Sequence, residues 1–176
     1  QQNYGTRFVP SHPTVTVYDA QGNTIRRFGS DKFNKPMWVD LAFLPDDRLI
    51  LAYPHRWTCR GLAGQPHLPV DEGAKTAWLL DVQHGNVHPL EFPHAVADAT
   101  VDDDGRIAIT CWDGRLYLLS ADNFRSGKLP MGIEISGPAL VRSRPRTGGW
   151  IVARSSGLIL FLDAAGKTVR EFNLSD

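Results

Sequence analysis

The sequence predicts an all-β fold of short antiparallel strands, and three observations carry this prediction. Apolar and polar residues alternate over short runs, which is the pattern of a half-buried strand. Gly, Asp-Gly, Asp-Asp and Pro separate these runs, and they are the residues that tight hairpin turns use. The periodicity of an amphipathic helix is nearly absent. The chain therefore belongs to a class in which hairpins are the building unit.

Thirteen segments show this pattern clearly, and a weaker strand is expected near Arg125–Met131. The clear strands are Val15–Tyr18, Thr24–Phe28, Val39–Leu44, Arg48–Tyr53, Thr76–Asp81, Val87–Phe92, Ala97–Val101, Arg106–Cys111, Arg115–Leu119, Ala139–Ser143, Trp150–Arg154, Leu158–Leu162 and Thr168–Phe172. Two of the five tryptophans, Trp78 and Trp150, fall inside these strands, and we expect them to be packing residues.

Composition restricts the functions that this chain can have. Its 176 residues suit one domain, and its 19 basic and 19 acidic side chains give no net charge. Such a balance argues against a protein built to bind nucleic acid or an anionic membrane. No apolar run is long enough to span a membrane. The first residue is Gln and no signal peptide is visible, so we expect a processed chain, and a secreted or periplasmic location is favoured.

One repeated unit is a strand, a polar turn and a return strand. Val17–Phe28 and Phe161–Phe172 match in step without a gap, and both contain Asp-Ala-x-Gly or its near equivalent at the turn. Looser copies lie at Leu80–Phe92 and Leu119–Asn123. Copies of one hairpin along a chain indicate a repeat architecture.

A second repeated unit alternates with the first. Val39–Leu51 matches Ala97–Ile109 with an offset of 58 throughout, and Pro138–Val152 is a third copy with a longer turn. The two units together give four strands in roughly 40 residues, which is the signature of a β-propeller blade. The segment Pro54–Gly73 is an insertion into this pattern.

The whole chain, 1–176, is thus predicted to be one β-propeller segment of about 3.5 blades. Its parts are a half blade (14–28), a blade with the insertion (37–92, insertion 54–73), and two further blades (96–131 and 137–173). Closed propellers have about 4 to 8 blades. The sequence favours part of a larger, 6–8-bladed propeller; closure by a second chain, or a small ring completed by residues 1–13, are the alternatives.

Two segments resemble a known family. The turn at Leu162–Lys167, found more loosely at Tyr18–Asn23, resembles the repeat of quinoprotein-like (PQQ-type) propellers, and so does Trp112–Leu119. The resemblance covers most of the chain at the level of the repeat, and it implies four-stranded blades. In that family a Trp closes each repeat and docks between blades; here the matching positions are Phe28, Phe92 and Phe172. WD40-like, kelch and NHL propellers share the same general pattern.

In a propeller, the loops between the second and third strands and the loops between blades meet on one face, which we call the channel-mouth face. The loops predicted to meet there are Pro54–Gly73, Trp112–Gly114, Ser155–Gly157, Gly29–Met37, Pro93–Val96 and Phe124–Gly137. Long insertions in such loops are typical of binding sites, although a plain surface loop is the alternative. The candidate ligand-binding residues are His55, Trp57, Arg60, His67, His94, Trp112, Arg154, Asp40 and Asp98.

Some of these candidates are expected to be equivalent between blades. Asp40 and Asp98 lie near the start of innermost strands, whereas Tyr53, Cys111 and Arg154 end the second strands. Paired carboxylates can bind a cation or a polar ligand, or act in acid–base chemistry. The favoured alternative is that each Asp caps backbone N–H groups of its own turn.

The two cysteines and the histidines allow further hypotheses. Cys59 and Cys111 are expected at or beyond the same end of the second strands of neighbouring blades, so a disulfide between them is a candidate. A buried Cys111 with an unpaired Cys59 is the alternative. His55, His67 and His94 could share one face, but no metal-binding spacing occurs and no metal site is predicted. The basic run at Arg142–Arg146 is interpreted as a solvated turn.

The functional prediction is a non-catalytic β-propeller that binds or assembles through the channel-mouth face around the 54–73 insertion. No catalytic residue and no cofactor are predicted, because no nucleophile, base and orienting group occur in a recognisable pattern. The expected partners are a protein, the remaining blades from the same or another chain, or a small polar ligand. The alternative is part of a quinoprotein-like or other propeller enzyme, completed by missing blades or another chain and using a quinone with calcium.

Overall fold

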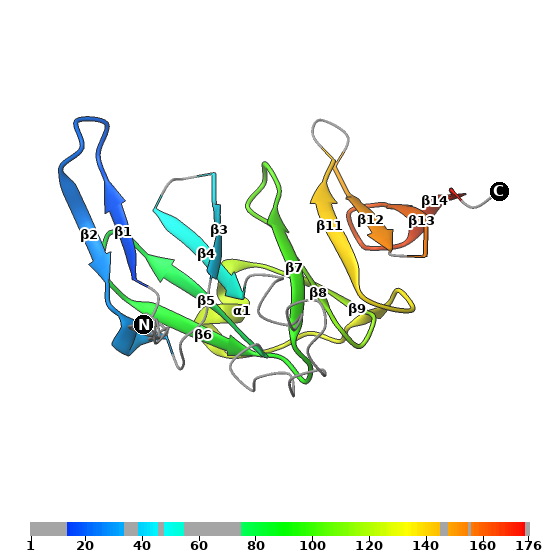
Figure 1. Ribbon diagram of the computed structural model, residues 1–176, viewed down its shortest axis with the longest axis horizontal. Coiled ribbons are helices and arrows are strands. Elements are labelled where there is room, and N and C mark those ends of the chain that lie inside the picture. The colour runs from blue at the N-terminus through cyan, green and yellow to red at the C-terminus, as the bar shows by residue number, and fades with distance from the viewer. Residues whose placement is uncertain are drawn as a thin grey trace, which may run out of the picture.

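The computed structural model describes residues 14–33, 39–45, 48–54, 75–144, 148–154 and 156–174. Within them the chain forms β-strands, one short α-helix and one turn of 3-10 helix (η1, Ser30–Lys32), so the predicted all-β class is confirmed. The strands form one two-stranded and three four-stranded antiparallel sheets that follow one another along the chain (Figure 1). No helix among these residues is long and apolar enough to cross a membrane.

We number the sheets I to IV in chain order. Sheet I pairs β1 (Val15–Tyr18) with β2 (Thr24–Phe28). Sheet II has the order β3 (Val39–Phe43), β4 (Leu49–Pro54), β5 (Thr76–Asp81) and β6 (Val87–Glu91). Sheet III has the order β7 (Val96–Val101), β8 (Ile107–Cys111), β9 (Arg115–Leu119) and β10 (Ile133–Glu134). Sheet IV has the order β11 (Ala139–Ser143), β12 (Trp150–Arg154), β13 (Leu158–Leu162) and β14 (Thr168–Asn173).

The strand expected near Arg125–Met131 is wrong. The chain forms helix α1 (Ala121–Ser126) there, and the outer strand of sheet III is the two-residue β10 further along. The helix begins because Asn123 Oδ1 accepts the backbone N–H of Ser120 at 2.9 Å. It ends at Gly127, whose left-handed φ of 66° suits glycine. Phe124 anchors the helix in the core between sheets II and III.

The repeated Asp of the hairpin turns serves the turn itself. Asp19 Oδ1 accepts the backbone N–H groups of Gln21 (3.0 Å) and Asn23 (2.8 Å). Asp163 Oδ1 does the same for Ala165 (3.0 Å) and Lys167 (2.9 Å). These bonds satisfy N–H groups that the tight turn would otherwise leave unpaired, which explains why the sequence repeats Asp at this place.

Strand register corrects one detail of the repeat. The backbone N–H of Leu44 closes the β3–β4 turn on Leu49, whereas Asp102 closes the β7–β8 turn on Arg106, so the first turn is one residue longer. Asp40 pairs with Tyr53 and Asp98 pairs with Thr110. The offset of 58 therefore holds between β3 and β7 but not between β4 and β8.

This register changes which strand-end residues are equivalent. Asp40 and Asp98 remain equivalent, as predicted. Asp40 pairs with Tyr53 and Asp98 with Thr110, and these two partners hold the same position on β4 and β8. The prediction that Tyr53, Cys111 and Arg154 are equivalent is wrong for Tyr53. The equivalent trio at these strand ends is Pro54, Cys111 and Arg154, which pair with the first residues of β3, β7 and β11.

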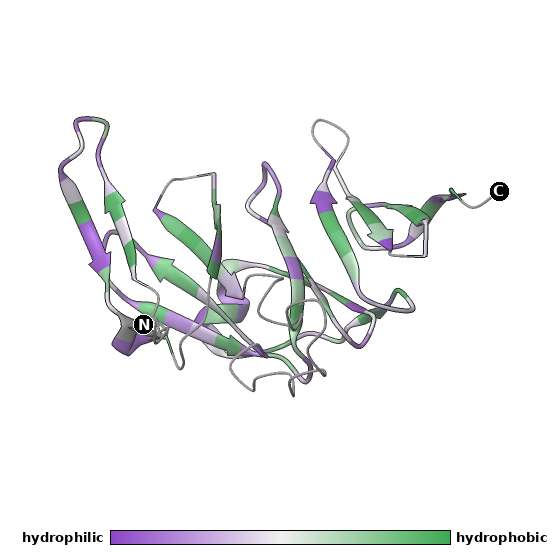
Figure 2. Ribbon diagram, viewed as in Figure 1, coloured by the Kyte–Doolittle hydropathy of each residue, from purple (hydrophilic) through white to green (hydrophobic). Residues whose placement is uncertain are grey.

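The sheets stack face to face, and successive side chains along a strand of sheet II point alternately toward sheet I and toward sheet III. On β4, Ile50 and Ala52 pack with sheet I, whereas Leu51 and Tyr53 pack with sheet III. Apolar residues accordingly follow one another along the central strands (Figure 2). Strands buried on both faces are expected to be near-continuously apolar, and β4 is buried throughout.

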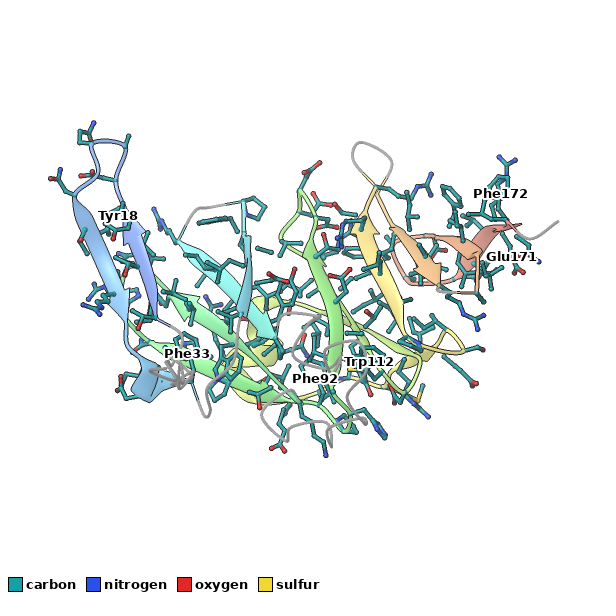
Figure 3. The ribbon with its side chains drawn as sticks, viewed as in Figure 1. Tyr18, Phe33, Phe92, Trp112, Glu171 and Phe172 are labelled. Atoms are coloured by element: carbon teal, nitrogen blue, oxygen red, sulfur yellow. The ribbon has the colours of Figure 1, made fainter. Side chains whose placement is uncertain are left out.

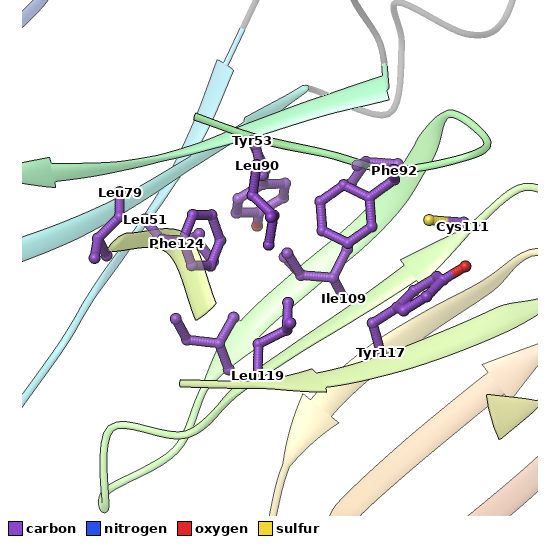
Figure 4. Packing of buried hydrophobic residues seen from close by; sticks show 14 of the residues in the cluster. Leu51, Tyr53, Leu79, Leu90, Phe92, Ile109, Cys111, Tyr117, Leu119 and Phe124 are labelled. Atoms are coloured by element: carbon purple, nitrogen blue, oxygen red, sulfur yellow. The ribbon is translucent and has the colours of Figure 1, made fainter. Parts of the chain in front are cut away.

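The core between sheets II and III is the largest of the three apolar clusters. Leu51, Leu79 and Leu90 of sheet II lie against residues of sheet III such as Ile109 and Leu119 (Figure 4). The Phe92 and Tyr117 rings meet edge to face, with centroids 5.3 Å apart. Trp78 and Trp150 are fully buried in the two other clusters, which confirms that they are packing residues.

Candidate binding face at the loop ends of the sheets

Three loops predicted for the channel-mouth face do come together in the described residues. The backbone N–H of Trp112, after β8, donates to Ala95 O at 2.9 Å in the loop between sheets II and III. The N–H of Ile135, before sheet IV, donates to Gly114 O at 2.7 Å. Backbone hydrogen bonds thus join the loops of neighbouring sheets along one edge of the sheets, at the lower side of the view, where Figure 3 labels Trp112.

Gly114 is where two of these loops approach most closely. A Cβ at this position would lie 2.1 Å from the backbone N of Gly137, and its φ is 81°. Only glycine fits such an approach in this conformation. Gly137 also lies beside the guanidinium of Arg154, a predicted site residue on β12 that is half-buried. Arg154 therefore borders the same loop cluster.

His94 lies on this face beside a partner that the sequence did not reveal. Its Nε2 is 3.8 Å from Asp113 Oδ2, and the Nε of Arg115 lies 3.5 Å from the same oxygen. Asp113 is mostly buried, whereas His94 and Arg115 are exposed. The carboxylate thus holds two cationic or hydrogen-bonding side chains at the rim, an arrangement that suits a polar or charged ligand.

Trp112 is half-buried rather than laid open on the face. Its side chain packs against the apolar cluster between sheets I and II. Its indole Nε1 is buried and has no hydrogen-bond partner among the described residues. An unpaired buried N–H costs about 1–3 kcal/mol, so Trp112 contributes here mainly through packing.

Asp98 has a role that neither sequence hypothesis anticipated. Its Oδ2 accepts the backbone N–H of Val141 at 2.9 Å and Nη1 of Arg142 at 2.6 Å, both on β11 of the next sheet. Thr110, its pairing partner, donates its hydroxyl to Ala139 O at 2.7 Å. The expectation that Asp98 caps its own turn is therefore wrong: its carboxylate joins sheet III to sheet IV.

Asp40, Tyr53 and Asp98 lie close together on the inner strands. Burial raises the pKa of the Tyr53 phenol, and the charges of Asp98 and Asp40 raise it further. Because this pKa is raised, Tyr53 stays protonated at neutral pH and is no nucleophile or base. The Asp98 carboxylate is already engaged by the backbone N–H of Val141 and by Arg142.

The remaining predicted residues lie outside the described residues. These are His55, Trp57, Arg60, His67 and Cys59. The Cys59–Cys111 disulfide stays a prediction for this reason; the side chain of Cys111 is fully buried, and burial raises the pKa of its thiol. In the described part of the chain, no three His, Cys, Asp or Glu side chains are placed to hold a metal ion.

Comparison with models of known protein families finds no match, and comparison with curated proteins finds none either. Function is therefore inferred from the residues and their geometry. The described part of the face combines one buried carboxylate, two exposed cationic or titratable side chains and a half-buried indole. These groups can recognise a polar or charged ligand.

Proposed function

We propose that this chain is a non-catalytic β-propeller segment that acts as a binding or assembly platform through its channel-mouth face. The observation that carries the proposal is the way the sheets repeat. Successive antiparallel sheets stack in chain order with equivalent positions on equivalent faces, and their loops join at one end. Successive four-stranded antiparallel sheets are compatible with propeller blades and support the proposal.

The engagement of the reactive side chains supports a non-catalytic role. Asp98 holds the next sheet, Cys111 is buried as a thiol of raised pKa, and the pKa of Tyr53 is raised as well. A catalytic nucleophile or base needs the opposite, an accessible group whose pKa is close to the working pH.

The rim around Asp113 supports binding of a polar partner. His94 and Arg115 both lie beside the same oxygen of the Asp113 carboxylate, and both are accessible. The 54–73 insertion starts at Pro54, the position equivalent to Cys111, and Trp112 and Asp113 directly follow Cys111. This equivalence of Pro54 and Cys111 supports counting the insertion as part of the proposed binding surface.

The test compares three forms of the protein in affinity capture from extracts of its source: the unaltered chain, a deletion of Gly61–Glu72, and His84→Ala. His84 lies in the β5–β6 turn beside Asp81, away from the loops of the channel-mouth face, and serves as the matched control. We expect a captured partner to be lost with the deletion and kept with H84A. Unchanged capture by a folded deletion variant, judged by circular dichroism, contradicts the proposal.

The alternative is a quinoprotein-like enzyme completed by other blades. Under it, Asp40 and Asp98 would be calcium or quinone ligands. Asp98 does not fit this role well, because its carboxylate is already bonded to Val141 and Arg142. A dye-linked dehydrogenase assay with added quinone and calcium tests this alternative directly, and activity there would displace the platform proposal.

A further inference from the structure

The outer face of sheet IV carries apolar side chains, and no other described sheet packs on it. Three cross-strand pairs occupy the same place in sheets I, II and IV: Val15 with Phe28, Ala77 with Leu90, and Ile159 with Phe172. The first two pairs are buried against the following sheet. Phe28 is 2% exposed and Leu90 3%, but Phe172 is 38% exposed. Sheet IV thus presents the same kind of surface that sheets I and II bury.

The opposite end of the stack presents the complementary surface. Tyr18 comes directly before the turn at Asp19, as Leu80 comes before Asp81 and Leu162 before Asp163. Leu80 and Leu162 are 0% and 1% exposed because they pack on the preceding sheet, whereas Tyr18 is 58% exposed. Ile25, across the turn, is also exposed. No other described sheet packs on this face of sheet I.

The two surfaces lie at opposite ends of the row of sheets. Figure 3 labels Tyr18 at one end and Phe172 at the other, and Figure 1 places sheets I and IV at these ends. One chain cannot bring its own two ends together in this arrangement. A second copy can bring such ends together. If the row of sheets continued from one copy to the next, the outer face of sheet IV would pack on the outer face of sheet I.

The outer face of sheet IV also carries cations on its rings. The Arg170 guanidinium lies 4.1 Å from the Phe172 ring centroid, and that of Arg144 lies 5.7 Å from the centroid of Phe161. If two copies met through this face alone, the arginines of one copy would lie against those of the other, and their like charges would repel. A contact with sheet I instead offers the ring of Tyr18, on which a guanidinium can stack.

From these observations, we propose that two copies of this chain associate head to tail, with sheet I of one copy packed on β13 and β14 of the other. The contact repeats the packing of sheet I on sheet II, with Tyr18 set against Phe161 and Phe172. It is heterologous, because two different surfaces meet, and two such contacts can close a dimer. The inference rests on the propeller-type stacking of the proposed function and names a second copy as one partner.

Sedimentation velocity of the whole chain over a wide range of concentration tests this. We expect the unaltered protein to sediment as a dimer or larger species, and Phe172→Glu and Tyr18→Glu each to sediment as a monomer of 19.5 kDa. Met131→Glu is the matched control, because Met131 is the most exposed of the large apolar residues and lies on neither face. Circular dichroism of each variant checks that the fold is kept.

Mixing the two variants is the decisive step. F172E keeps an intact sheet I surface and Y18E keeps an intact sheet IV surface, so an equimolar mixture should form a 1:1 dimer that neither variant forms alone. A monomeric unaltered protein overturns the inference, and so does an association that M131E removes equally or that the mixture does not restore. The capture experiment on the channel-mouth face is independent, since a monomer keeps that face.

Discussion

The carboxylate of Asp98 accepts the backbone N–H of Val141 at 2.9 Å, although the two residues are 43 positions apart and belong to different sheets. The bond lies between the inner strands β7 and β11 of neighbouring sheets. Arg142 Nη1 adds a charge-assisted bond to the same oxygen at 2.6 Å. A polar link thus accompanies the apolar core between sheets III and IV.

Replacing Asp98 should destabilise the protein. In Asp98→Ala the N–H of Val141 loses its acceptor in a buried place, and we expect the free energy of unfolding to fall by about 2–4 kcal/mol. Asp122→Ala is the control, because its ion pair with Arg125 is exposed, and it should change stability by less than about 1 kcal/mol. Urea denaturation measures both. Equal losses of unfolding free energy in the two variants would mean that the Asp98 hydrogen bonds stabilise the fold no more than an exposed ion pair does.

A pair of glycines separates backbone strain from a steric clash. Gly22 and Gly114 have nearly the same φ, 84° and 81°, but a Cβ on Gly22 meets nothing within 4 Å, whereas one on Gly114 would lie 2.1 Å from Gly137 N. We expect Gly22→Ala to cost about 1–2 kcal/mol, the usual penalty of a left-handed conformation. Gly114→Ala should cost clearly more and should also loosen the loops around Asp113.

Thermal or urea unfolding compares the two alanine variants, and hydrogen exchange of the Ile135 amide reports on the loop contact, since this amide donates to Gly114 O. Faster exchange is expected in Gly114→Ala alone. If Gly22→Ala proves equally costly, the close approach of the two loops is not the reason for glycine at position 114.

Local patterns were sufficient to predict most strands and turns. Alternation over a few residues identifies a strand without knowledge of its partners. The Asp side chains of the Asp19 and Asp163 turns bond only to groups within four residues along the chain. The helix α1 was missed because its signals are a short capping pattern, Ser120 with Asn123, and a single Gly127. One short helix has too few residues for a periodic pattern to appear.

The site depended on contacts that one sequence does not display. The one-residue difference between the Leu44–Leu49 and Asp102–Arg106 turns shifts the register of β4, and an ungapped match hides it. Asp113 was not recognised as the partner of His94 because they come from different loops. The convergence of those loops was predictable from the repeat, but the choice of partner was not.

Cys111 should be inert in the folded protein. Its side chain is fully buried and burial raises its pKa, so both access and thiolate are lacking. In Cys59→Ser, which leaves Cys111 as the single cysteine, a thiol reagent such as Ellman's should react only at the rate of unfolding, and at once in urea. Rapid reaction under native conditions would show that the core between sheets II and III opens readily.

Stability should fall at high pH because of Tyr53. Its pKa in the folded protein is raised above the usual value near 10, chiefly by burial and then by the charges of Asp98 and Asp40. Above pH 10 the unfolded chain loses this proton while the folded chain keeps it, so the unfolded state is favoured increasingly as pH rises. Below pH 10 both states hold the proton and the effect vanishes.

Tyr53→Phe removes this titration and keeps the ring. The slope of unfolding free energy against pH above 10 should therefore be smaller in Y53F than in the unaltered protein, when both are measured by urea denaturation. Tyr18→Phe is the matched control, because it removes the hydroxyl of an exposed tyrosine. If Y53F and the unaltered chain lose stability in parallel through this range, Tyr53 is not held protonated between the inner strands, and the proximity of Asp40 and Asp98 to its hydroxyl carries no energetic weight.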